Sequence, residues 1–210
     1  IWFLIILSIF FLNRIVYLII MKNYPKKLLT KEIEDFKKVL KRINKITNFE
    51  KLCLVCLKAV KNKKKIIFFG NGGSAADSQH LATELTVRYK KKRKAIAAIA
   101  LSTDNSAITA IGNDIDFKFI FSRQLEAIGN SGDVAIALTT SGNSLNLVEA
   151  FKVANKKKIL TCCFSGNNGG KLKKYTKCPV IIPSKITSII QVCELLIGQV
   201  LCDFLESNVK

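Results

Sequence analysis

A glycine-rich segment in the first half of the chain carries residue types that could bind an anion or a sugar. Residues 70–77 read GNGGSAAD and stand between the apolar run 66–69 and a stretch with helical spacing. A glycine-rich turn between a strand and a helix presents bare backbone N–H groups at the positive end of the helix dipole. Such a turn suits a phosphate or a polyhydroxylated ligand, and Ser74 is the expected N-cap of the helix.

The helix expected after this turn carries a candidate acid/base pair. His80 and Glu84 are four residues apart, so they share one face of the helix. His80 is the single histidine of the chain, and a lone histidine is more often structural. Its partner Glu84 and its position behind an anion-binding turn favour a functional role.

A second loop repeats this pattern farther along the chain. Residues 139–144 read TTSGNS and follow the apolar run 133–138. Four hydroxyl groups, a glycine and the start of a helix form a phosphate cradle that needs no lysine. The G-x-x-x-x-G-K-[ST] pattern of an NTPase loop is absent from it. The alternative is an ordinary helix cap, for which a single hydroxyl group would be enough.

The first loop also fits a second kind of site. Residues 70–75 match the dinucleotide-binding pattern G-x-G-x-x-G/A, and Asp104 follows the next apolar run. A dinucleotide site would leave the hydroxyl-rich loop at 139–144 unexplained, so we favour a phosphosugar-like ligand.

Short apolar runs and helical segments alternate between and around these loops. The runs do not alternate polar with apolar residues, which is typical of strands buried on both faces of a parallel sheet. The expected strands are residues 65–69, 96–101, 133–138, 159–164 and 179–182. The expected helices are two over 31–61, broken near 47–48, and then 74–89, 105–111, 117–128, 144–155, 169–175 and 187–207.

This order predicts an α/β fold, a three-layer sandwich with a five-stranded parallel sheet and N-terminal helices. Ligands of such sheets bind beyond the carboxyl ends of the strands. Both loops follow predicted strands and would lie at that edge.

The charge and the cysteines limit the partners and the compartment. The formal net charge is +19, but the lysines form short runs at the expected ends of elements, with no interleaved aromatic residues for stacking bases. We therefore expect a surface that attracts anionic substrates rather than nucleic acid. Seven cysteines without a spaced disulfide framework indicate a reducing cytoplasm, and Cys53 and Cys56 are expected to be core residues rather than a redox or zinc pair.

Residues 1–20 form an almost wholly apolar leader that is treated apart from the domain at 21–210. They lack the basic start and the small-residue cleavage site of a signal peptide. The length allows a membrane helix, although Arg14 would be costly inside the span. We favour translated upstream sequence with Met21 as the start, so that contact with a membrane is expected only if this segment is expressed.

Taken together, the two loops resemble the sugar isomerase (SIS) domain, with its flavodoxin-like fold, and within it the phosphoheptose isomerases. The motifs, in order, are GNGGSAAD, QHLATEL, ALSTDNSAITAIGND, FSRQLEAIG, GDVAIALTTSGNS and the ending LLIGQVLCDFLE. The resemblance implies a homotetramer with active sites at subunit interfaces. It also implies conversion of sedoheptulose 7-phosphate to D-glycero-D-manno-heptose 7-phosphate for surface polysaccharide such as lipopolysaccharide.

The resemblance also implies a role for each matching residue. Glu84 would shuttle a proton between C1 and C2 through an enediol. The residues expected to contact the sugar are Asn71, Gly72, Gly73, Ser74 and Gln191, with Asn113 and Asp114 lining the same pocket. The residues expected to hold the phosphate are Thr139, Thr140, Ser141 and Ser144. His80 and Gln191 match positions that bind zinc in some members.

The last helix departs from the family pattern. Gln199 stands where the family usually has a histidine that acts as the second acid/base, and Glu194 replaces another frequent histidine. Glutamine can polarise an oxygen but cannot exchange a proton near neutral pH. A zinc site formed by His80, Glu84 and Gln191 is weakened too, because zinc prefers nitrogen, sulfur and carboxylate ligands.

These residues lead to an aldose–ketose isomerase with Glu84 as base and His80 or water as the acid. The alternative is a non-catalytic SIS protein that binds a phosphosugar, of the kind that binds the bacterial replication initiator. The retained Glu84 and intact loops favour the enzyme.

Overall fold

The computed structural model describes residues 2–42, 44 and 46–209, with side chains from residue 21 onward within these ranges. The chain divides into two compact units, Ile1–Lys41 and Arg42–Lys210. The first unit contains the helix α1 (Trp2–Leu40), which has Pro25 inside it. The side chains of residues 1–20 lie outside the described residues, so the expectations for this leader remain predictions.

The second unit is built on a five-stranded parallel sheet in the order β2-β1-β3-β4-β5. The strands are β1 (Ile66–Gly70), β2 (Ala98–Ala100), β3 (Val134–Thr139), β4 (Leu160–Ser165) and β5 (Cys178–Ile181). All five predicted strands are confirmed, and every residue of β1 and β3 is buried. Apolar side chains on both faces explain why these segments show no alternation.

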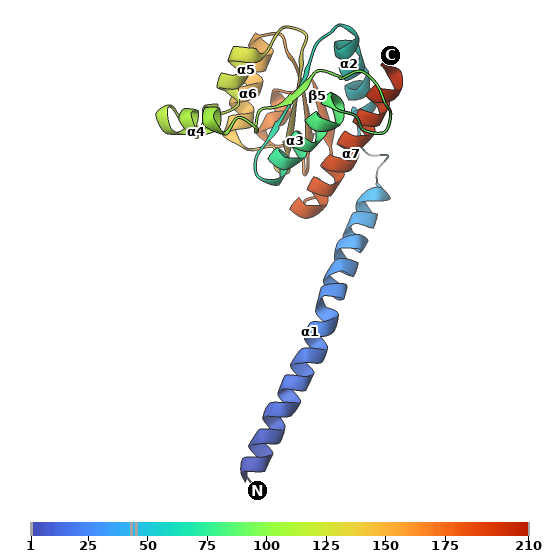
Figure 1. The fold of residues 1–210 in the computed structure, drawn as a ribbon, viewed down its shortest axis with the longest axis vertical. Coiled ribbons are helices and arrows are strands. Elements are labelled where there is room, and N and C mark those ends of the chain that lie inside the picture. Colours follow the sequence, from blue (N-terminus) through green and yellow to red (C-terminus); the bar gives the residue numbers. More distant parts are fainter. Residues whose placement is uncertain (1, 43, 45, 210) are drawn as a thin grey trace. The chain divides into compact units, whose positions relative to one another are not determined.

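Helices cover both faces of this sheet, and the predicted three-layer arrangement is confirmed (Figure 1). On one face lie α2 (Phe49–Lys61), α3 (Gly73–Thr86) and α7 (Thr187–Asn208). On the other lie α5 (Ser122–Ile128) and α6 (Leu145–Lys156). The core beneath α5 and α6 includes Phe69, whose ring centroid is 5.3 Å from that of Phe121 and 5.9 Å from that of Phe151.

Three predicted helices differ from the structure. The first helix expected within 31–61 is the last part of α1, which ends at Leu40, before the predicted break near 47–48. The predicted helix 117–128 is divided into the 3-10 helix η2 (Phe117–Phe119) and α5. The interruption falls at Ile120 and Phe121, which are both buried in the core, so tertiary packing outweighs the helical spacing. The predicted helix 169–175 is only the short 3-10 helix η3 (Lys171–Lys174), which follows two glycines with positive φ angles.

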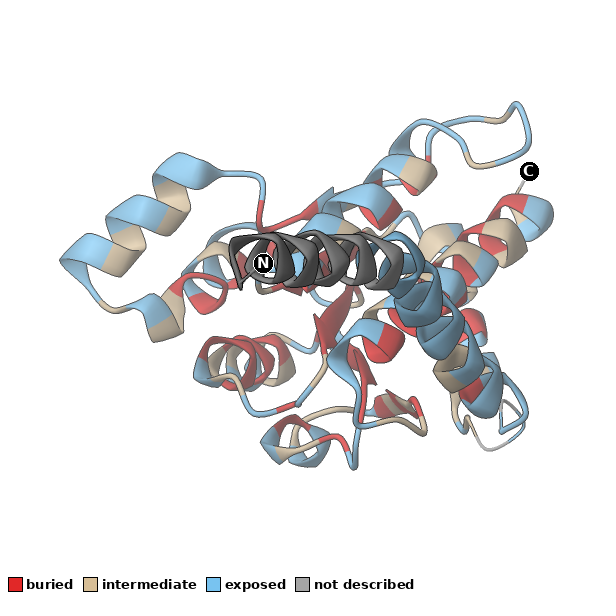
Figure 2. Cartoon of the chain, turned by 90° about the horizontal axis from the view of Figure 1, so that it is seen from below, coloured by how far each residue is buried: buried red, intermediate tan, exposed pale blue. Residues whose placement is uncertain are grey.

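The helix α4 (Asn105–Asp114) differs from the others because none of its residues is buried. Its N-cap is Asp104, whose side chain accepts a hydrogen bond from the backbone N–H of Ala107 at 2.9 Å. Figure 2 shows this helix, at the left in both views, in the colours of exposed and intermediate residues. It packs against η2 rather than against the sheet.

One helix among the residues whose side chains are described is long and apolar enough to cross a membrane, namely α7. Half of its apolar window is buried. This burial is what a core helix of a globular domain would show, since α7 packs against α2 and α3.

Candidate active site

The two predicted loops emerge side by side at one edge of the sheet. β1 and β3 are hydrogen-bonded neighbours, with Gly70 opposite Leu138, and one loop follows each strand. In the order β2-β1-β3-β4-β5, the direction of strand succession reverses between β1 and β3. Ligands of open α/β sheets bind at such a switch point. The first loop is also joined to the first turn of α6, which follows the second loop, because the amides of Asn71 and Asn146 exchange hydrogen bonds of 3.1 and 2.8 Å.

The first loop depends on glycine for its shape. Gly72 has φ +55°, a conformation that favours glycine, and it is the N-cap of α3. At Gly73, a Cβ atom would overlap the side-chain amide of Gln191 on α7. Gln191 therefore lies directly against this turn.

The prediction that Ser74 is the N-cap of α3 is wrong. The N-cap is Gly72, two residues earlier, and the helix begins at Gly73, so the Ser74 side chain is inside the first turn and buried. Its hydroxyl donates a hydrogen bond of 3.0 Å to Oε2 of Glu194 on α7. Ser74 thus fixes the helix to its neighbour instead of capping it.

The second loop keeps hydroxyl hydrogens available for a ligand. Thr139 Oγ1 accepts a hydrogen bond from the backbone N–H of Gly142 at 3.1 Å, and Ser141 Oγ accepts one from Asn143 at 3.2 Å. Because each oxygen acts as an acceptor, its own hydrogen can still be donated to a phosphate oxygen. Ser144 is the N-cap of α6 without its side chain capping the helix, so the first backbone N–H groups of α6 face the loop.

A neighbouring loop fixes the second loop in place. Gly142 has φ +67°, and a Cβ atom there would overlap the backbone oxygen of Gly169. The backbone oxygen of Gly142 also accepts a hydrogen bond of 2.9 Å from the N–H of Leu172. Two backbone segments therefore pack without an intervening side chain, which leaves the loop little freedom to move.

The predicted acid/base pair lies on the helix that starts in the first loop. His80 Nε2 is 2.9 Å from Glu84 Oε1, with 44% of the His80 side chain and 20% of the Glu84 side chain exposed. The predicted sharing of one helix face is confirmed. α7 packs along α3 at this level, because a Cβ at Gly198 would meet the side chain of Leu81. Gln199 follows Gly198 and is partly exposed.

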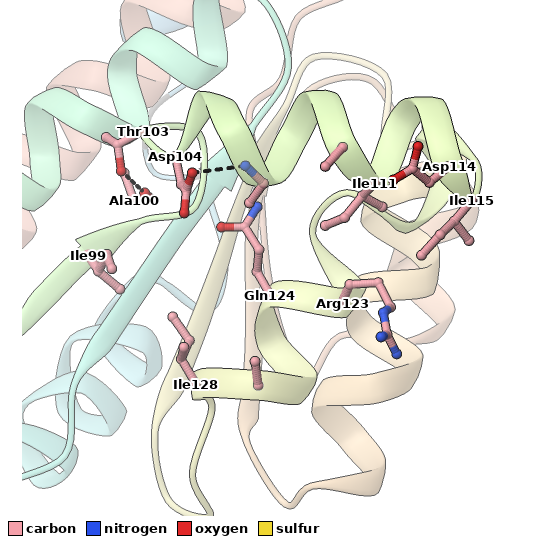
Figure 3. A pocket seen from close by; sticks show the side chains of 13 residues that line it. Ile99, Ala100, Thr103, Asp104, Ile111, Asp114, Ile115, Arg123, Gln124 and Ile128 are labelled. Atoms are coloured by element: carbon pink, nitrogen blue, oxygen red, sulfur yellow. Dashed lines mark hydrogen bonds between the residues drawn. The ribbon is translucent and has the colours of Figure 1, made fainter.

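In the single chain, Asn113 and Asp114 do not lie with the two loops and the His80–Glu84 pair. They lie at the exposed end of α4, where the Asn113 amide donates to Asp114 Oδ1 at 2.8 Å. Asp114 borders a groove of about 480 Å³ between α4 and α5 (Figure 3). Arg123, Gln124 and Asp104 also line this groove, which includes no residue of either loop.

Two buried residues of the site had no role assigned from the sequence, Asn146 and Glu194. Glu194 is fully buried, and besides Ser74 it accepts a hydrogen bond of 3.0 Å from the backbone N–H of Thr139. Burial, aided by the charge of Asp77, raises the pKa of Glu194 to about 8. The signal in the sequence was a carboxylate on the apolar face of α7, between Ile190 and Ile197.

The donor set does not suit zinc. Within the described residues, no group of three or more His, Cys, Asp or Glu side chains could hold a metal ion. His80 and Glu84 hydrogen-bond to each other, and Gln191 adds only an amide oxygen. Zinc sites in proteins use imidazole, thiolate and carboxylate ligands. We therefore derive no chemical step through a metal.

Comparison of the chain with known proteins finds a matching family model and similar sequences and structures. The family model of the SIS domain matches residues 33–166. The chain is 42% identical to the phosphoheptose isomerase of Sulfurimonas denitrificans, over 90% of this chain and 97% of that protein. It is 48% identical to the phosphoheptose isomerase of Paramagnetospirillum magneticum, over 76% of this chain and 83% of that protein. The solved structure of the phosphoheptose isomerase from Neisseria gonorrhoeae aligns with a TM-score of 0.81 at 35% identity, over 87% of this chain and 98% of that one.

Proposed function

The chain belongs to the phosphoheptose isomerases, the aldose–ketose isomerases of the SIS-domain family, and we propose that it holds sedoheptulose 7-phosphate between its two loops while Glu84 moves a proton between C1 and C2. The observation that carries this proposal is the position of the His80–Glu84 pair. The pair lies on α3, the helix that begins in the first loop. The Asn71–Asn146 amide pair joins that loop to α6, the helix that follows the second loop.

The phosphate is bound by the second loop. Thr139, Thr140, Ser141 and Ser144 supply hydroxyl donors, and the N-terminus of α6 supplies backbone N–H groups and a positive dipole end. This cradle binds a dianion without a buried lysine. The surrounding net charge of +19 raises the local concentration of anionic substrates.

The sugar carbons extend toward the first loop and the acid/base pair. Asn71, Gly72, Gly73 and Gln191 supply amide and backbone groups for the hydroxyl groups of the sugar. Asn113 and Asp114 belong to the same pocket in our proposal. Because they lie on the exposed helix α4, they would reach it from another copy of the chain or by movement of α4.

Glu84 acts as the base. Its carboxylate takes the proton from C1 of the ketose, the C1–H electrons form the C1=C2 double bond, and O2 gains a proton, which gives the enediol. Return of the proton to C2 and loss of the O1 proton then give the aldose, so that no atom is gained or lost. The hydrogen bond of 2.9 Å from the His80 ring fixes the Glu84 carboxylate for this transfer. His80 or a water molecule exchanges the oxygen protons, because the Gln199 amide can only polarise an oxygen.

The assembly that we propose is a homotetramer with the site closed at a subunit interface. Val192, Leu196 and Val200 on α7 are 51%, 38% and 46% exposed and are spaced four residues apart, so they form one apolar stripe. Val87, just after α3, is 63% exposed. Covering this stripe would remove water from the neighbourhood of Glu84, which favours proton transfer from carbon.

The compartment and the pathway that we propose rest on the cysteines and on the family resemblance. The seven cysteines are all free and buried, a state that fits a reducing cytoplasm. We propose a cytoplasmic enzyme whose heptose 7-phosphate product is used for surface polysaccharide such as lipopolysaccharide.

The test compares sedoheptulose 7-phosphate with unphosphorylated sedoheptulose, using the full chain and following the product by NMR. We expect conversion of the phosphorylated ketose and at least about a hundredfold lower kcat/KM for the free sugar, because the second loop contributes binding through several charge-assisted hydrogen bonds. Equal rates for the two sugars, or no conversion of either, would contradict the proposal.

One observation favours a second function, a phosphosugar-binding protein without catalysis. Gln199 stands where the family resemblance implies a proton-transferring histidine. In that case the chain would bind sedoheptulose 7-phosphate, seen as changes in its NMR spectrum, without product and without exchange of carbon-bound hydrogen.

A further inference from the structure

A buried carboxyl group connects the two loops of the proposed active site. Glu194 on α7 is 0% exposed, and each of its oxygens accepts one hydrogen bond of 3.0 Å. One donor is the hydroxyl of Ser74, in the first turn of α3. The other is the backbone N–H of Thr139, the last residue of β3 and the first of the phosphate loop. Glu194 is thus a bridge between the starts of the two ligand-binding elements.

The surroundings of this bridge disfavour a negative charge. Asp77 on α3, Cys163 on β4 and Cys193 on α7 are the titratable groups that interact with Glu194. Burial is the largest cause that raises its pKa, to about 8, and the hydrogen bonds from Ser74 and Thr139 only partly oppose it. The carboxyl group is therefore neutral at pH 7. In this state one oxygen can still accept from the backbone N–H of Thr139, and the acid O–H can donate to the hydroxyl oxygen of Ser74.

We propose that Glu194 is a positioning residue that fixes the spacing between the sugar-binding turn and the phosphate-binding loop, and that it does so as a neutral acid when a phosphosugar is bound. This inference rests on the proposed function, because it assumes a ligand that reaches both loops at once. A fixed spacing matters for such a ligand, since an error of about 1 Å between substrate and catalytic group can reduce a rate a hundredfold.

The neutral state matters because of the phosphate. Glu194 accepts a hydrogen bond from the backbone N–H of Thr139, which is the first residue of the loop that would hold a dianion. An ionised Glu194 would place a buried negative charge behind that loop, where little water screens it. Affinity for the phosphosugar should therefore fall when Glu194 loses its proton.

The experiment measures kcat and KM for sedoheptulose 7-phosphate between pH 6.5 and 9.5 with four forms of the full chain: wild type, Glu194→Gln, Glu194→Ala and Asp203→Asn. Glutamine reproduces the neutral acid, with an oxygen toward Thr139 and an N–H toward Ser74. Asp203→Asn is the matched control, because it removes an exposed carboxylate from the same helix, paired only with Lys90 at 2.7 Å.

We expect KM of the wild type to rise above pH 8, by at most about tenfold per pH unit, and the Asp203→Asn variant to follow it. The Glu194→Gln variant should keep a KM that is independent of pH in this range, with kcat close to that of the wild type. The Glu194→Ala variant should have KM raised at least tenfold at pH 7. A purely structural role would not remove the pH dependence of KM while leaving kcat unchanged.

The proposal is overturned if Glu194→Gln shows the same rise of KM as the wild type, or if Glu194→Ala keeps the wild-type KM at pH 7. If Glu194→Ala does not fold, the pH profile of the glutamine variant decides alone. If the wild type converts no sedoheptulose 7-phosphate, the proposed function fails separately. Affinity for inorganic phosphate, measured by calorimetry, then replaces KM: a decrease above pH 8 in the wild type but not in Glu194→Gln supports the role of Glu194, and identical profiles reject it.

Discussion

At the scale of single residues, Gln199 is the main difference between this chain and the acid/base arrangement implied by its family. It is partly exposed on α7 beside Gly198, which packs on Leu81 of α3. An amide at this point can orient a sugar oxygen but cannot give or take its proton. Under our proposal, the proton exchange between O1 and O2 is therefore carried out by His80 or by water.

Replacing Gln199 with histidine should restore that proton exchange. We expect Gln199→His to raise kcat by about 10- to 100-fold, because general acid/base catalysis by a positioned side chain contributes 10²–10⁴-fold. Steady-state kinetics at pH 7 would show it, with Gln199→Asn as the control that keeps an amide. A lower kcat in the histidine variant would mean that the reaction depends on the amide of Gln199 itself.

The protonation of Glu194 should also appear in the stability of the protein. Its folded-state pKa, about 8, lies above the ordinary value of 4.5, so the folded state holds this proton more tightly than the unfolded state. The contribution of Glu194 to the free energy of unfolding should therefore be intact below pH 4.5 and decrease as the pH rises toward 8, by at most about 1.4 kcal/mol per pH unit.

Urea unfolding of the wild type and Glu194→Gln at pH 5, 6.5 and 8 measures this contribution. The glutamine variant should gain stability relative to the wild type as the pH rises. Parallel curves for the two proteins would show that Glu194 is not the group that titrates.

At the scale of elements, α7 holds α3 at both ends. Glu194 bonds to the first turn of α3, and Glu206 accepts hydrogen bonds from the backbone N–H groups of Tyr89 and Lys90 beyond its end, at 2.8 and 3.0 Å. Arg93, 3.5 Å from Glu206, donates to the backbone oxygens of Glu84 and Leu85 at 2.7 and 2.8 Å. The helix that carries Glu84 is thus fixed by its neighbour.

Removing the negative charge of Glu206 should weaken this attachment. Glu206→Gln leaves the buried guanidinium of Arg93 without its counter-ion, and we expect a loss of about 3 kcal/mol in the free energy of unfolding. Urea denaturation would measure it. Glu149→Gln, in an exposed pair with Lys152, is the control and should change stability by less than about 1 kcal/mol. Equal effects of the two substitutions would show that the buried pair has no special role.

Much of the arrangement of elements could be predicted from the sequence, and the exceptions have physical reasons. β1 and β3 were placed to within one residue, because strands buried on both faces give short, unbroken apolar runs. The two loops and the His80–Glu84 pair were also found, since glycines, hydroxyl groups and an i,i+4 spacing are local signals. The partner of Ser74 was missed because Glu194 is 120 residues away along the chain. The division of 117–128 was missed because core packing of Ile120 and Phe121 outweighs local helical spacing.

At the scale of the whole molecule, the single chain brings together the two loops and the His80–Glu84 pair, but not Asn113 and Asp114. The exposed helix α4 and the apolar stripe Val192, Leu196 and Val200 are the surfaces that a second copy would use under our proposal. Such contacts cannot be predicted from local sequence patterns, because exposed leucine and valine residues are common on any protein surface.

A charge in the centre of the stripe should separate the subunits. We expect Leu196→Glu to lower the oligomeric state measured by light scattering and to reduce kcat/KM at least tenfold, because a carboxylate cannot be buried unpaired in an apolar contact. Leu54→Glu is the matched control, as Leu54 is 61% exposed on α2. An unchanged tetramer in Leu196→Glu would place the interface elsewhere, and a monomeric wild type with full activity would reject the interface altogether.

The central claim is that Glu84 carries a proton between C1 and C2 of a bound ketose phosphate. It is tested most directly by NMR of sedoheptulose 7-phosphate with the full chain in deuterated water, comparing the wild type with Glu84→Gln. The account predicts deuterium at C2 of an aldose product with the wild type, and a rate lower by about 10²–10⁴-fold with Glu84→Gln, whose folding is checked by circular dichroism. Equal deuterium incorporation by a folded Glu84→Gln variant, or binding by the wild type without any exchange, would contradict it.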